Sequence, residues 1–449
     1  MSEIIEQPRY GCALSAQQTV LAIPRALPII HAGPGCASKA FSFAATGAGF
    51  QGEGYGGGSH ISSTNTGESE VIFGGEPSLE KEIKGALKIL DGDLFVVLSG
   101  CTSDIVGDDS ISVAERFAAQ GYPVVGTETA GFKGSSYYGH EIVVKSIIEQ
   151  FIGDVKPQVR HGLVNVFAVV PFQDPFWRGD LEEIKRILTN IGLEVNILFG
   201  NGSAGISEWR DIPNAQFNLL ISPSTGTEIA ELLEAKYQTP YLQYPILPVG
   251  GVETSRFLRE VAAFAGLSSL PVEKAIEKEE RRFYDYFVAV SDFIGEYWNN
   301  LPVDLYAVGD SIYAPGVSSF LVNELGLVPR GVYVTDEPQP AWQSVITETL
   351  AARDSRLAAV LKFENDGGAI EMDIREKDKN AGKSIILGSS WEKFLAVDVD
   401  SLYAYLSLPL DEIVILNHSY MGYSGGLRLI EEVYSAVFKR KTATSRSIV

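Results

Sequence analysis

Residues 93–126 read DLFVVLSGCTSDIVGDDSISVAERFAAQGYPVVG, and this stretch decides the fold. The apolar run at 93–99 predicts a buried strand, residues 110–120 have the spacing of an amphipathic helix, and residues 122–126 predict a second strand. A strand, a helix and a strand in this order indicate a parallel βαβ unit. The fold class is therefore α/β.

The same alternation extends along the whole chain. The elements expected in addition to this unit are helix 13–23, strand 26–31, helices 37–45 and 79–90, strand 165–170, helix 179–191, strands 194–199 and 218–222, helices 228–236 and 272–298, strand 304–308, helix 316–325, strands 330–334, 384–387 and 413–417, and helix 425–439. We expect three doubly wound, Rossmann-like domains with parallel sheets, at residues 1–160, 161–298 and 299–449.

The charge of the chain excludes some kinds of partner. Its 449 residues carry a formal net charge of -21, whereas a surface for nucleic acid or anionic membrane needs clustered Lys and Arg. No apolar run approaches the roughly 18 residues of a membrane helix, and residues 1–12 lack the basic and apolar regions of an export signal. We expect a cytoplasmic protein whose partners are proteins or small molecules.

Cysteine occurs at only three positions, Cys12, Cys36 and Cys101, and a glycine precedes each of them. Each cysteine follows a strand or begins a helix, and the carboxyl ends of parallel strands meet at one edge of a sheet. The spacings are far too long for a zinc knuckle or a C-x-x-C redox pair. We therefore expect the three thiols at one rim, as an incomplete ligand set for an iron-sulfur cluster.

The glycines before the cysteines, Gly11, Gly35 and Gly100, are candidate cofactor-binding residues. Glycine lets the backbone approach an inorganic core and donate N–H bonds to its sulfides. The competing interpretation is that small buried cysteines only fill gaps in a core. Metal ligation is favoured because all three cysteines share a preceding glycine and a place at the end of an element.

Four segments carry a family resemblance: HAGPGC at 31–36, VIFGGEPSL at 71–79, GCTSDIVGDD at 100–109 and GYSGGLRLIEEV at 422–433. The chain resembles the component 1 subunits of nitrogenase and nitrogenase-like reductases over nearly its whole length. The resemblance implies three α/β domains, with Cys12, Cys36 and Cys101 matching the cysteines that hold the P-cluster between two homologous subunits. That cluster has eight irons and seven sulfides, and a four-iron, four-sulfide cluster is the alternative.

The resemblance also implies partners. They are a homologous alpha-type subunit, in a heterotetramer, and an ATP-dependent iron protein that delivers electrons. In this family the alpha subunit binds the active-site cofactor through one further cysteine and a histidine. All three cysteines here are already assigned, so the chain resembles a beta-type subunit of an oxidoreductase and has no catalytic residue of its own.

Some features distinguish the chain from molybdenum nitrogenase beta subunits. Gly131 stands where those subunits supply a serine ligand, and the GFKG segment at 131–134 with Gly139 and His140 resembles the alpha pattern. The resemblance therefore favours an alternative nitrogenase or a nitrogenase-like enzyme such as methylthio-alkane reductase. Two other functions remain open: a scaffold for assembly of the nitrogenase cofactor, and an α/β protein that binds a small molecule and has three unrelated thiols.

Other polar residues have simpler interpretations. Asp108 and Asp109 precede the expected helix 110–120, so N-capping is favoured over metal or acid-base chemistry. His31 and His418 end strands, where a hydrogen-bonded structural role is favoured over ligation. The glycine-rich segment from Gly52 to Gly58 lacks the lysine of a P-loop and is not interpreted as a nucleotide site.

Overall fold

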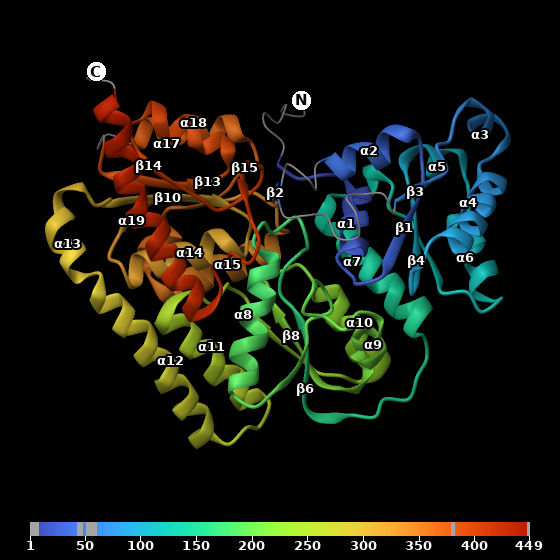
Figure 1. Ribbon diagram of the computed structural model, residues 1–449, viewed down its shortest axis with the longest axis horizontal. Helices are drawn as coiled ribbons and strands as arrows, with labels where there is room; N and C mark the ends of the chain where they lie inside the picture. Colours follow the sequence, from blue (N-terminus) through green and yellow to red (C-terminus); the bar gives the residue numbers. More distant parts are fainter. Residues whose placement is uncertain (1–8, 43–47, 51–60, 379–381, 447–449) are drawn as a thin grey trace.

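The computed structural model describes residues 9–42, 48–50, 61–378 and 382–446, and its architecture is built on three parallel sheets (Figure 1). Every strand pair in these ranges is parallel, including the small sheet of β15 (Leu410–Val414) and β2 (Ala48–Phe50). The α/β class with doubly wound parallel sheets is confirmed. Within the same ranges, no helix is long and apolar enough to cross a bilayer.

The first sheet has the strand order β3-β1-β4-β5. Its strands are β1 (Ala26–His31), β3 (Ser62–Ser63), β4 (Leu94–Ser99) and β5 (Val124–Thr127). The helical segments around it are η1 (Ala13–Ala16), α1 (Gln17–Leu21), α2 (Pro34–Ser42), α3 (Glu68–Phe73), α4 (Glu76–Ile89), α5 (Cys101–Val106), α6 (Ser110–Ala118), η3 (Gly131–Lys133), α7 (Ser136–Ser146) and the π-helical η4 (Ile147–Ile152).

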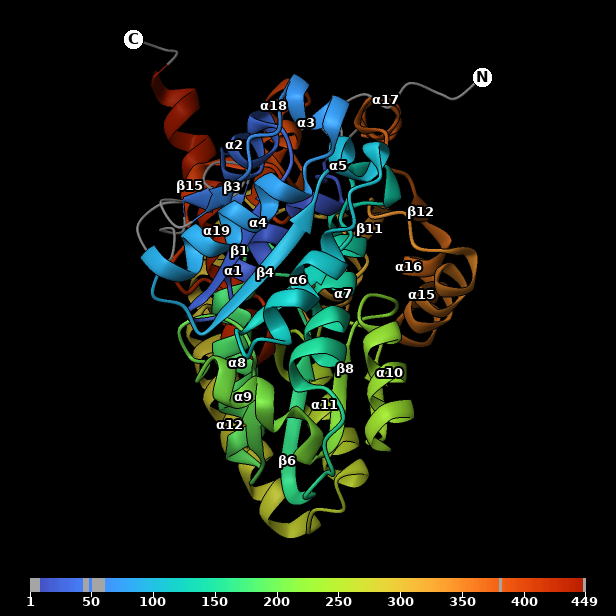
Figure 2. The same ribbon diagram turned by 90° about the vertical axis from the view of Figure 1, so that its right-hand side faces the viewer.

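Both faces of the first sheet are apolar, because successive strand residues point to opposite faces. Leu27 and Ile29 of β1 belong to a core shared with α4 and α6, which cover the outer face (Figure 2). Ile30 belongs instead to the large central core that also includes residues of α1 and α7. Gly126 of β5 lets α6 approach closely, since a Cβ there would lie 2.8 Å from the Cα of Ile111.

The second sheet has the order β7-β6-β8-β9 and lies next to the first (Figure 1). Its strands are β6 (Arg160–Phe167), β7 (Glu194–Asn196), β8 (Ala215–Ile221) and β9 (Tyr241–Tyr244). The helices that accompany it are α8 (Trp177–Asn190), α9 (Ile206–Asp211), η5 (Ile212–Asn214), α10 (Thr227–Tyr237) and α11 (Gly250–Phe264).

The third sheet has the order β12-β11-β10-β13-β14. Its strands are β10 (Asp304–Gly309), β11 (Val328–Val334), β12 (Leu361–Phe363), β13 (Ser384–Gly388) and β14 (Leu402–Tyr405). The remaining helices are α12 (Ser269–Ala289), α13 (Ser291–Tyr297) and η6 (Trp298–Asn300), which lead into this sheet, and α14 (Tyr313–Asn323), α15 (Pro340–Arg353), α16 (Ser355–Ala359), α17 (Gly367–Lys377), α18 (Ser390–Asp398) and α19 (Gly422–Arg446).

The structure corrects several expected elements. The helix expected at 272–298 divides into α12, α13 and η6, and the strand expected at 194–199 ends at Asn196. The strand expected at 413–417 is β15 at Leu410–Val414, because its ladder to β2 pairs Leu410 with Ala48 and Val414 with Phe50. The helix expected at 13–23 divides into η1 and α1. The helix expected at 37–45 begins at Pro34, which the first turn of a helix accepts, and residues 43–45 lie outside the described ranges, as do Gly52 to Gly58.

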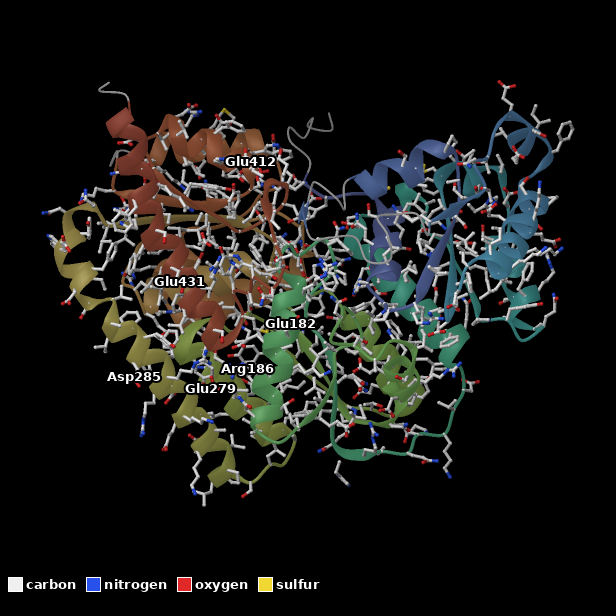
Figure 3. All side chains as sticks on the ribbon, viewed as in Figure 1. Glu182, Arg186, Glu279, Asp285, Glu412 and Glu431 are labelled. Atoms are coloured by element: carbon white, nitrogen blue, oxygen red, sulfur yellow. The ribbon has the colours of Figure 1, made fainter. Side chains whose placement is uncertain are left out.

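A partly buried ion-pair network joins the second and third regions of the chain. Arg186 on α8 contacts Glu279 on α12 at 2.6 Å and Glu183 on its own helix at 2.8 Å (Figure 3). Glu183 also accepts a hydrogen bond from the backbone N–H of Ser424 on α19 at 3.2 Å. Three helices far apart in sequence are thus held together around one guanidinium.

Candidate metal centre

Cys101 is the first residue of α5, immediately beyond the carboxyl end of β4. The backbone N–H of Gly100 donates to the carbonyl oxygen of His31 at 2.9 Å, and a Cβ at Gly100 would lie 2.5 Å from the Cβ of Ala32. Glycine at this position therefore allows the chain leaving β4 to pack against the chain leaving β1. This close approach fixes where α5, and hence Cys101, begins.

Cys12 lies in extended backbone before η1 and forms an antiparallel bridge with Ser135. The N–H of Ala13 donates to the carbonyl of Gly134 at 2.9 Å, and the N–H of Ser136 donates to the carbonyl of Gly11 at 2.9 Å. These bonds attach the Cys12 segment to the chain between β5 and α7. Cys12 is exposed, whereas Cys101 is partly buried.

Gly131 brings Cys12 and Cys101 together. A Cβ at Gly131 would lie 3.1 Å from the sulfur of Cys12 and 3.2 Å from the sulfur of Cys101, so both sulfurs flank the same point. The N–H of Gly131 also points to the sulfur of Cys101, with a nitrogen–sulfur distance of 3.1 Å. The expected meeting of separate loops therefore occurs for two of the three cysteines, with a backbone donor to sulfur supplied by a third loop.

Cys36 lies in the first turn of α2, after β1. Residues His31 and Ser99 are register partners at the ends of β1 and β4, so α2 and α5 leave the same edge of the sheet. Helix α2 also contacts η1, which follows Cys12. Gly35 has nothing within 4 Å of a Cβ position, so its assignment as a cofactor-binding residue remains a prediction.

No three His, Cys, Asp or Glu residues among those the structure describes are grouped to hold a single metal ion. Gly131 unites two thiols, and the third is placed at the same sheet edge by strand register. The arrangement is that of donors spread over several loops.

His31 has a structural role. Its side chain is fully buried, its Nε2 lies 3.0 Å from Asp108, and its Nδ1 lies 3.1 Å from the hydroxyl of Thr64. Burial lowers the pKa of His31, although the hydrogen bond to Asp108 opposes this shift. The carbonyl of His31 accepts the hydroxyl of Ser103 at 2.6 Å, so this residue supports the first turn of α5.

The two aspartates after Cys101 have different roles. Asp109 caps α6, because its carboxylate accepts the N–H of Ser112 at 2.9 Å. The hydroxyl of Ser112 also donates to this carboxylate, at 2.6 Å, and the two hydrogen bonds lower the pKa of Asp109, the hydroxyl most. Asp108 does not cap α6. Its carboxylate binds His31 and accepts the N–H of Gly75 at 2.8 Å, at the beginning of α4. The capping interpretation is thus confirmed for Asp109 and wrong for Asp108.

His418 is held between aromatic rings, with its ring centroid 4.6 Å from that of Phe176 and an interplanar angle of 27°. Burial lowers the pKa of His418 to about 4. Its Nε2 is buried without a hydrogen-bond partner in the described part of the chain. The geometry supports the structural interpretation of His418.

His140 lies in the interior, beside a small cavity where the three regions of the chain meet. Its Nδ1 lies 2.9 Å from the hydroxyl of Thr19, and burial lowers its pKa to about 3. The cavity leaves about 10 Å³ for the centre of a water molecule, which is enough for one water. Its lining includes His140, Phe167, Val170, Phe199, Ser222 and Ile312.

An exposed apolar patch near Cys101 was not predicted from the sequence. We define it as Val71, Ile72 and Phe73 on α3, Ile105 on α5 and Phe132 on η3, whose exposed fractions are 47%, 70%, 83%, 74% and 61%. Helices α3 and α5 are in contact. The sequence feature that could have indicated this patch is the run of three apolar residues before a Gly-Gly pair. Three consecutive residues of a helix cannot all face a core, so at least one of them is exposed.

The comparisons with known proteins identify the family of the chain. A family model for nitrogenase component 1 type oxidoreductases matches residues 12–438. The vanadium-iron protein beta chain of Trichormus variabilis is 23% identical over 96% of this chain and 93% of its own. The molybdenum-iron protein beta chain of Sinorhizobium fredii is 26% identical over 85% and 75%.

A solved structure of nitrogenase Cp1 at pH 6.5 superimposes with a TM-score of 0.79 at 20% identity, and it covers 98% of this chain and 95% of its own. At this identity the superposition supports the fold alone. The family model identifies the chain as an oxidoreductase subunit. The chain belongs to the nitrogenase component 1 family, and it is a beta-type subunit.

Proposed function

We propose that this chain is the electron-relay subunit of a nitrogenase-like reductase. In this proposal Cys12, Cys36 and Cys101 hold one side of a P-cluster-type centre, and an alpha-type subunit holds the other side. The observation that carries the proposal is the meeting of Cys12 and Cys101 at Gly131, with Cys12 exposed. An exposed thiol at an incomplete ligand set is available to a centre shared with a second chain.

The residues present fit an iron-sulfur centre. Thiolates are its usual protein ligands, and N–H donors to sulfur tune its potential. The N–H of Gly131 already points to the sulfur of Cys101. When bound, such a centre would supply one-electron relay between an ATP-dependent iron protein and the cofactor of the partner. The three cysteines are free of disulfides, which suits a reducing compartment such as the cytoplasm.

The apolar patch supports docking of the iron protein at this end of the chain. Exposed apolar patches that lie together on a soluble protein mark interaction sites. Ile105 is four residues from Cys101 on the same helix, and Phe132 follows Gly131 directly. We call the edge of the first sheet that carries Cys12, Cys36 and Cys101 the sulfur-bearing edge. A reductase that covers the apolar patch would lie over this edge, where electrons must enter.

The interior supports placing the active-site cofactor in the partner. The cavity beside His140 has room for one water, and bulky side chains such as Phe167 and Phe199 line it. All three cysteines of the chain are assigned to the shared centre. We therefore expect substrate reduction to occur in the alpha-type subunit, with the two subunits forming a heterotetramer.

The enzyme that we propose for this subunit is an alternative nitrogenase or a nitrogenase-like enzyme such as methylthio-alkane reductase. Its support is Gly131, which has no side-chain oxygen to offer between the sulfurs of Cys12 and Cys101. Assays of the purified complex with dinitrogen and with a thioether, each with reductase and ATP, test this assignment. Reduction of neither substrate, together with transfer of a cofactor to another enzyme, would favour the assembly scaffold instead.

Iron and acid-labile sulfide analysis tests the proposed centre. The chain is co-expressed anaerobically with a homologous alpha-type subunit, and the complex is compared with its Cys101→Ala variant. We expect iron and sulfide in the wild-type complex and a severalfold loss in the variant, because one thiolate ligand is missing. A wild-type complex without iron would contradict the proposal and favour three unrelated thiols.

A further inference from the structure

The loop that carries Gly131 is joined to the Cys101 segment by successive contacts. Next to β4, Thr129 donates its N–H to the hydroxyl of Ser99 at 3.2 Å and its own hydroxyl to the carbonyl of Ser99 at 3.0 Å. Two residues further on, the N–H of Gly131 reaches the sulfur of Cys101 at 3.1 Å. The two segments therefore run side by side through the sulfur-bearing edge.

Beyond the contact of Gly131 with Cys101, an ion pair joins the two segments. The ammonium of Lys133 on η3 lies 2.9 Å from the carboxylate of Asp104 on α5. Lys133 also pairs with Glu128, at the start of the same loop. The side chain of Asp104 is 9% exposed and that of Lys133 is 25% exposed, so the pair is largely withdrawn from solvent. A partly buried pair is screened less than a surface pair.

We propose that Lys133 is a positioning residue for the cluster: its ion pair with Asp104 holds the N–H of Gly131 against the sulfur of Cys101. Gly131 and Lys133 are the ends of one short 3-10 helix, and Cys101 and Asp104 lie in one turn of α5. The ion pair between Lys133 and Asp104 therefore restrains the distance between Gly131 and Cys101. This inference rests on the proposed function, because it concerns the sulfur that binds iron.

The consequence is a change in reduction potential. An N–H directed at a cluster sulfur stabilises the negative charge added on reduction. Loosening that contact makes reduction harder and lowers the potential. We call the ion pair between Lys133 and Asp104 the clamp. Lys133→Met removes this ion pair and also a positive charge, and both changes lower the potential. Asp104→Ala removes the clamp but takes away a negative charge, whose loss by itself would raise the potential.

The two substitutions change the local charge in opposite directions, so together they separate the effect of the ion pair from the effect of charge. Both variants are made in the complete complex with its partner, and the midpoint potential is measured by titration monitored with electron paramagnetic resonance. We expect the potential of Lys133→Met to fall by about tenfold in the equilibrium constant, which is about 59 mV for one electron. We expect a smaller fall in Asp104→Ala, because the lost negative charge opposes it. A potential that rises in Asp104→Ala, or that stays unchanged in both variants, would overturn the inference.

Two further variants serve as controls. Lys133→Arg keeps a cation that can pair with Asp104, and we expect it to restore most of the wild-type potential. Lys84→Met removes a lysine on α4 that is 66% exposed and pairs with Glu80 at 3.5 Å, and we expect no shift. An equal fall in Lys84→Met would show a general charge effect and contradict the clamp.

Iron content separates this inference from the proposed function. A wild-type complex without iron would defeat the proposed function itself. A wild-type complex that contains iron, with an unchanged potential in both clamp variants, would defeat only the role of Lys133. We expect both variants to retain wild-type iron, since the three cysteines are intact, and loss of iron from both would also contradict a purely positioning role.

Discussion

At the residue scale, Gly131 controls the space between the thiols of Cys12 and Cys101. A Cβ there would lie 3.1 Å from the Cβ and the sulfur of Cys12 and 3.2 Å from the sulfur of Cys101. Such separations are closer than normal van der Waals contact, so one of the cysteines must move. Ligand thiols tolerate little displacement, because metal–sulfur geometry is fixed.

We therefore expect Gly131→Ala to reduce the iron content of the purified complex in part, by less than Cys101→Ala does, because the cysteines need to move only a few tenths of an ångström. The matched control is Gly85→Ala on α4, where no atom lies within 4 Å of a Cβ position and alanine is the better helix former. Iron analysis of both variants checks the prediction. Full iron occupancy in Gly131→Ala would show that the sulfurs are not held at this glycine.

His140 makes stability depend on pH. Burial lowers its pKa to about 3, whereas an unfolded histidine titrates near 6.5. Between these values only the unfolded chain binds the proton, so stability is lost as the pH falls below about 6.5. The loss is about 2 kcal/mol at pH 5, from about 1.36 kcal/mol per pH unit.

The measurement is the difference in free energy of unfolding between wild type and His140→Gln, which cannot titrate. We expect the wild type to lose about 2 kcal/mol of unfolding free energy relative to His140→Gln as the pH falls from 7.5 to 5. A pH-independent difference for His140→Gln would show that the folded chain protonates the ring as readily as the unfolded chain does.

Sequence reasoning identified the cysteines but not all their surroundings. Gly100 could be predicted as a close-approach glycine, and the structure supplies the reason in the Cβ of Ala32. The pairing of Asp108 with His31 could not be predicted, because the two residues are distant in sequence and meet only when α4, α5 and β1 pack. Lys133 likewise gave no signal, since its partner Asp104 lies in another loop.

At the element scale, the contact of α8 with α12 depends on Arg186. Its guanidinium is bound by Glu183 and Glu279, whose side chains are 7% and 10% exposed, whereas the arginine itself is 34% exposed. Removing one carboxylate leaves the other to hold the charge, and partial exposure screens the remainder.

We expect Glu279→Gln to lower the free energy of unfolding by about 1 to 2 kcal/mol. Glu277→Gln, at an exposed position on the same helix, is the control and should change stability by less than about 0.5 kcal/mol. Denaturant unfolding measures both. Equal effects of the two substitutions would mean that the network does not stabilise the contact.

Buried central strands were predicted well because their composition is decisive. The strand expected at 26–31 matches β1 to the residue, and β4, β10 and β13 each differ from expectation by one residue. Central strand β6 was expected at 165–170 but lies at Arg160–Phe167. Short edge strands such as β12 and β14 were missed, because three and four residues are too few to establish a repeating pattern. At 413–417, the apolar residues Val414 and Leu416 indicated a strand, but their side chains are 67% and 69% exposed.

At the scale of the whole molecule, the apolar patch lies beside the sulfur-bearing edge, and the small cavity lies in the interior. A docking partner at the patch would therefore act on electron entry and leave the folded interior unchanged. Three sheets could be predicted from the alternation of strands and helices. The patch could not, because exposure depends on how α3, α5 and η3 come together.

We expect Phe73→Asp to raise the apparent KM for the reductase at least about tenfold, because it places a charge in a surface that must be desolvated on docking. Iron content should not change. Ile89→Asp, at a position 80% exposed on α4 and outside the patch, is the control. An unchanged KM in Phe73→Asp, measured by turnover at varied reductase concentration, would remove the patch from the docking surface.

The most direct measurement is anomalous diffraction at the iron edge from crystals of the complete complex. The account predicts iron density in contact with the sulfurs of Cys12, Cys36 and Cys101 that continues to thiolates of the alpha-type subunit. Iron density absent from these three sulfurs, or enclosed by one chain alone, would contradict it.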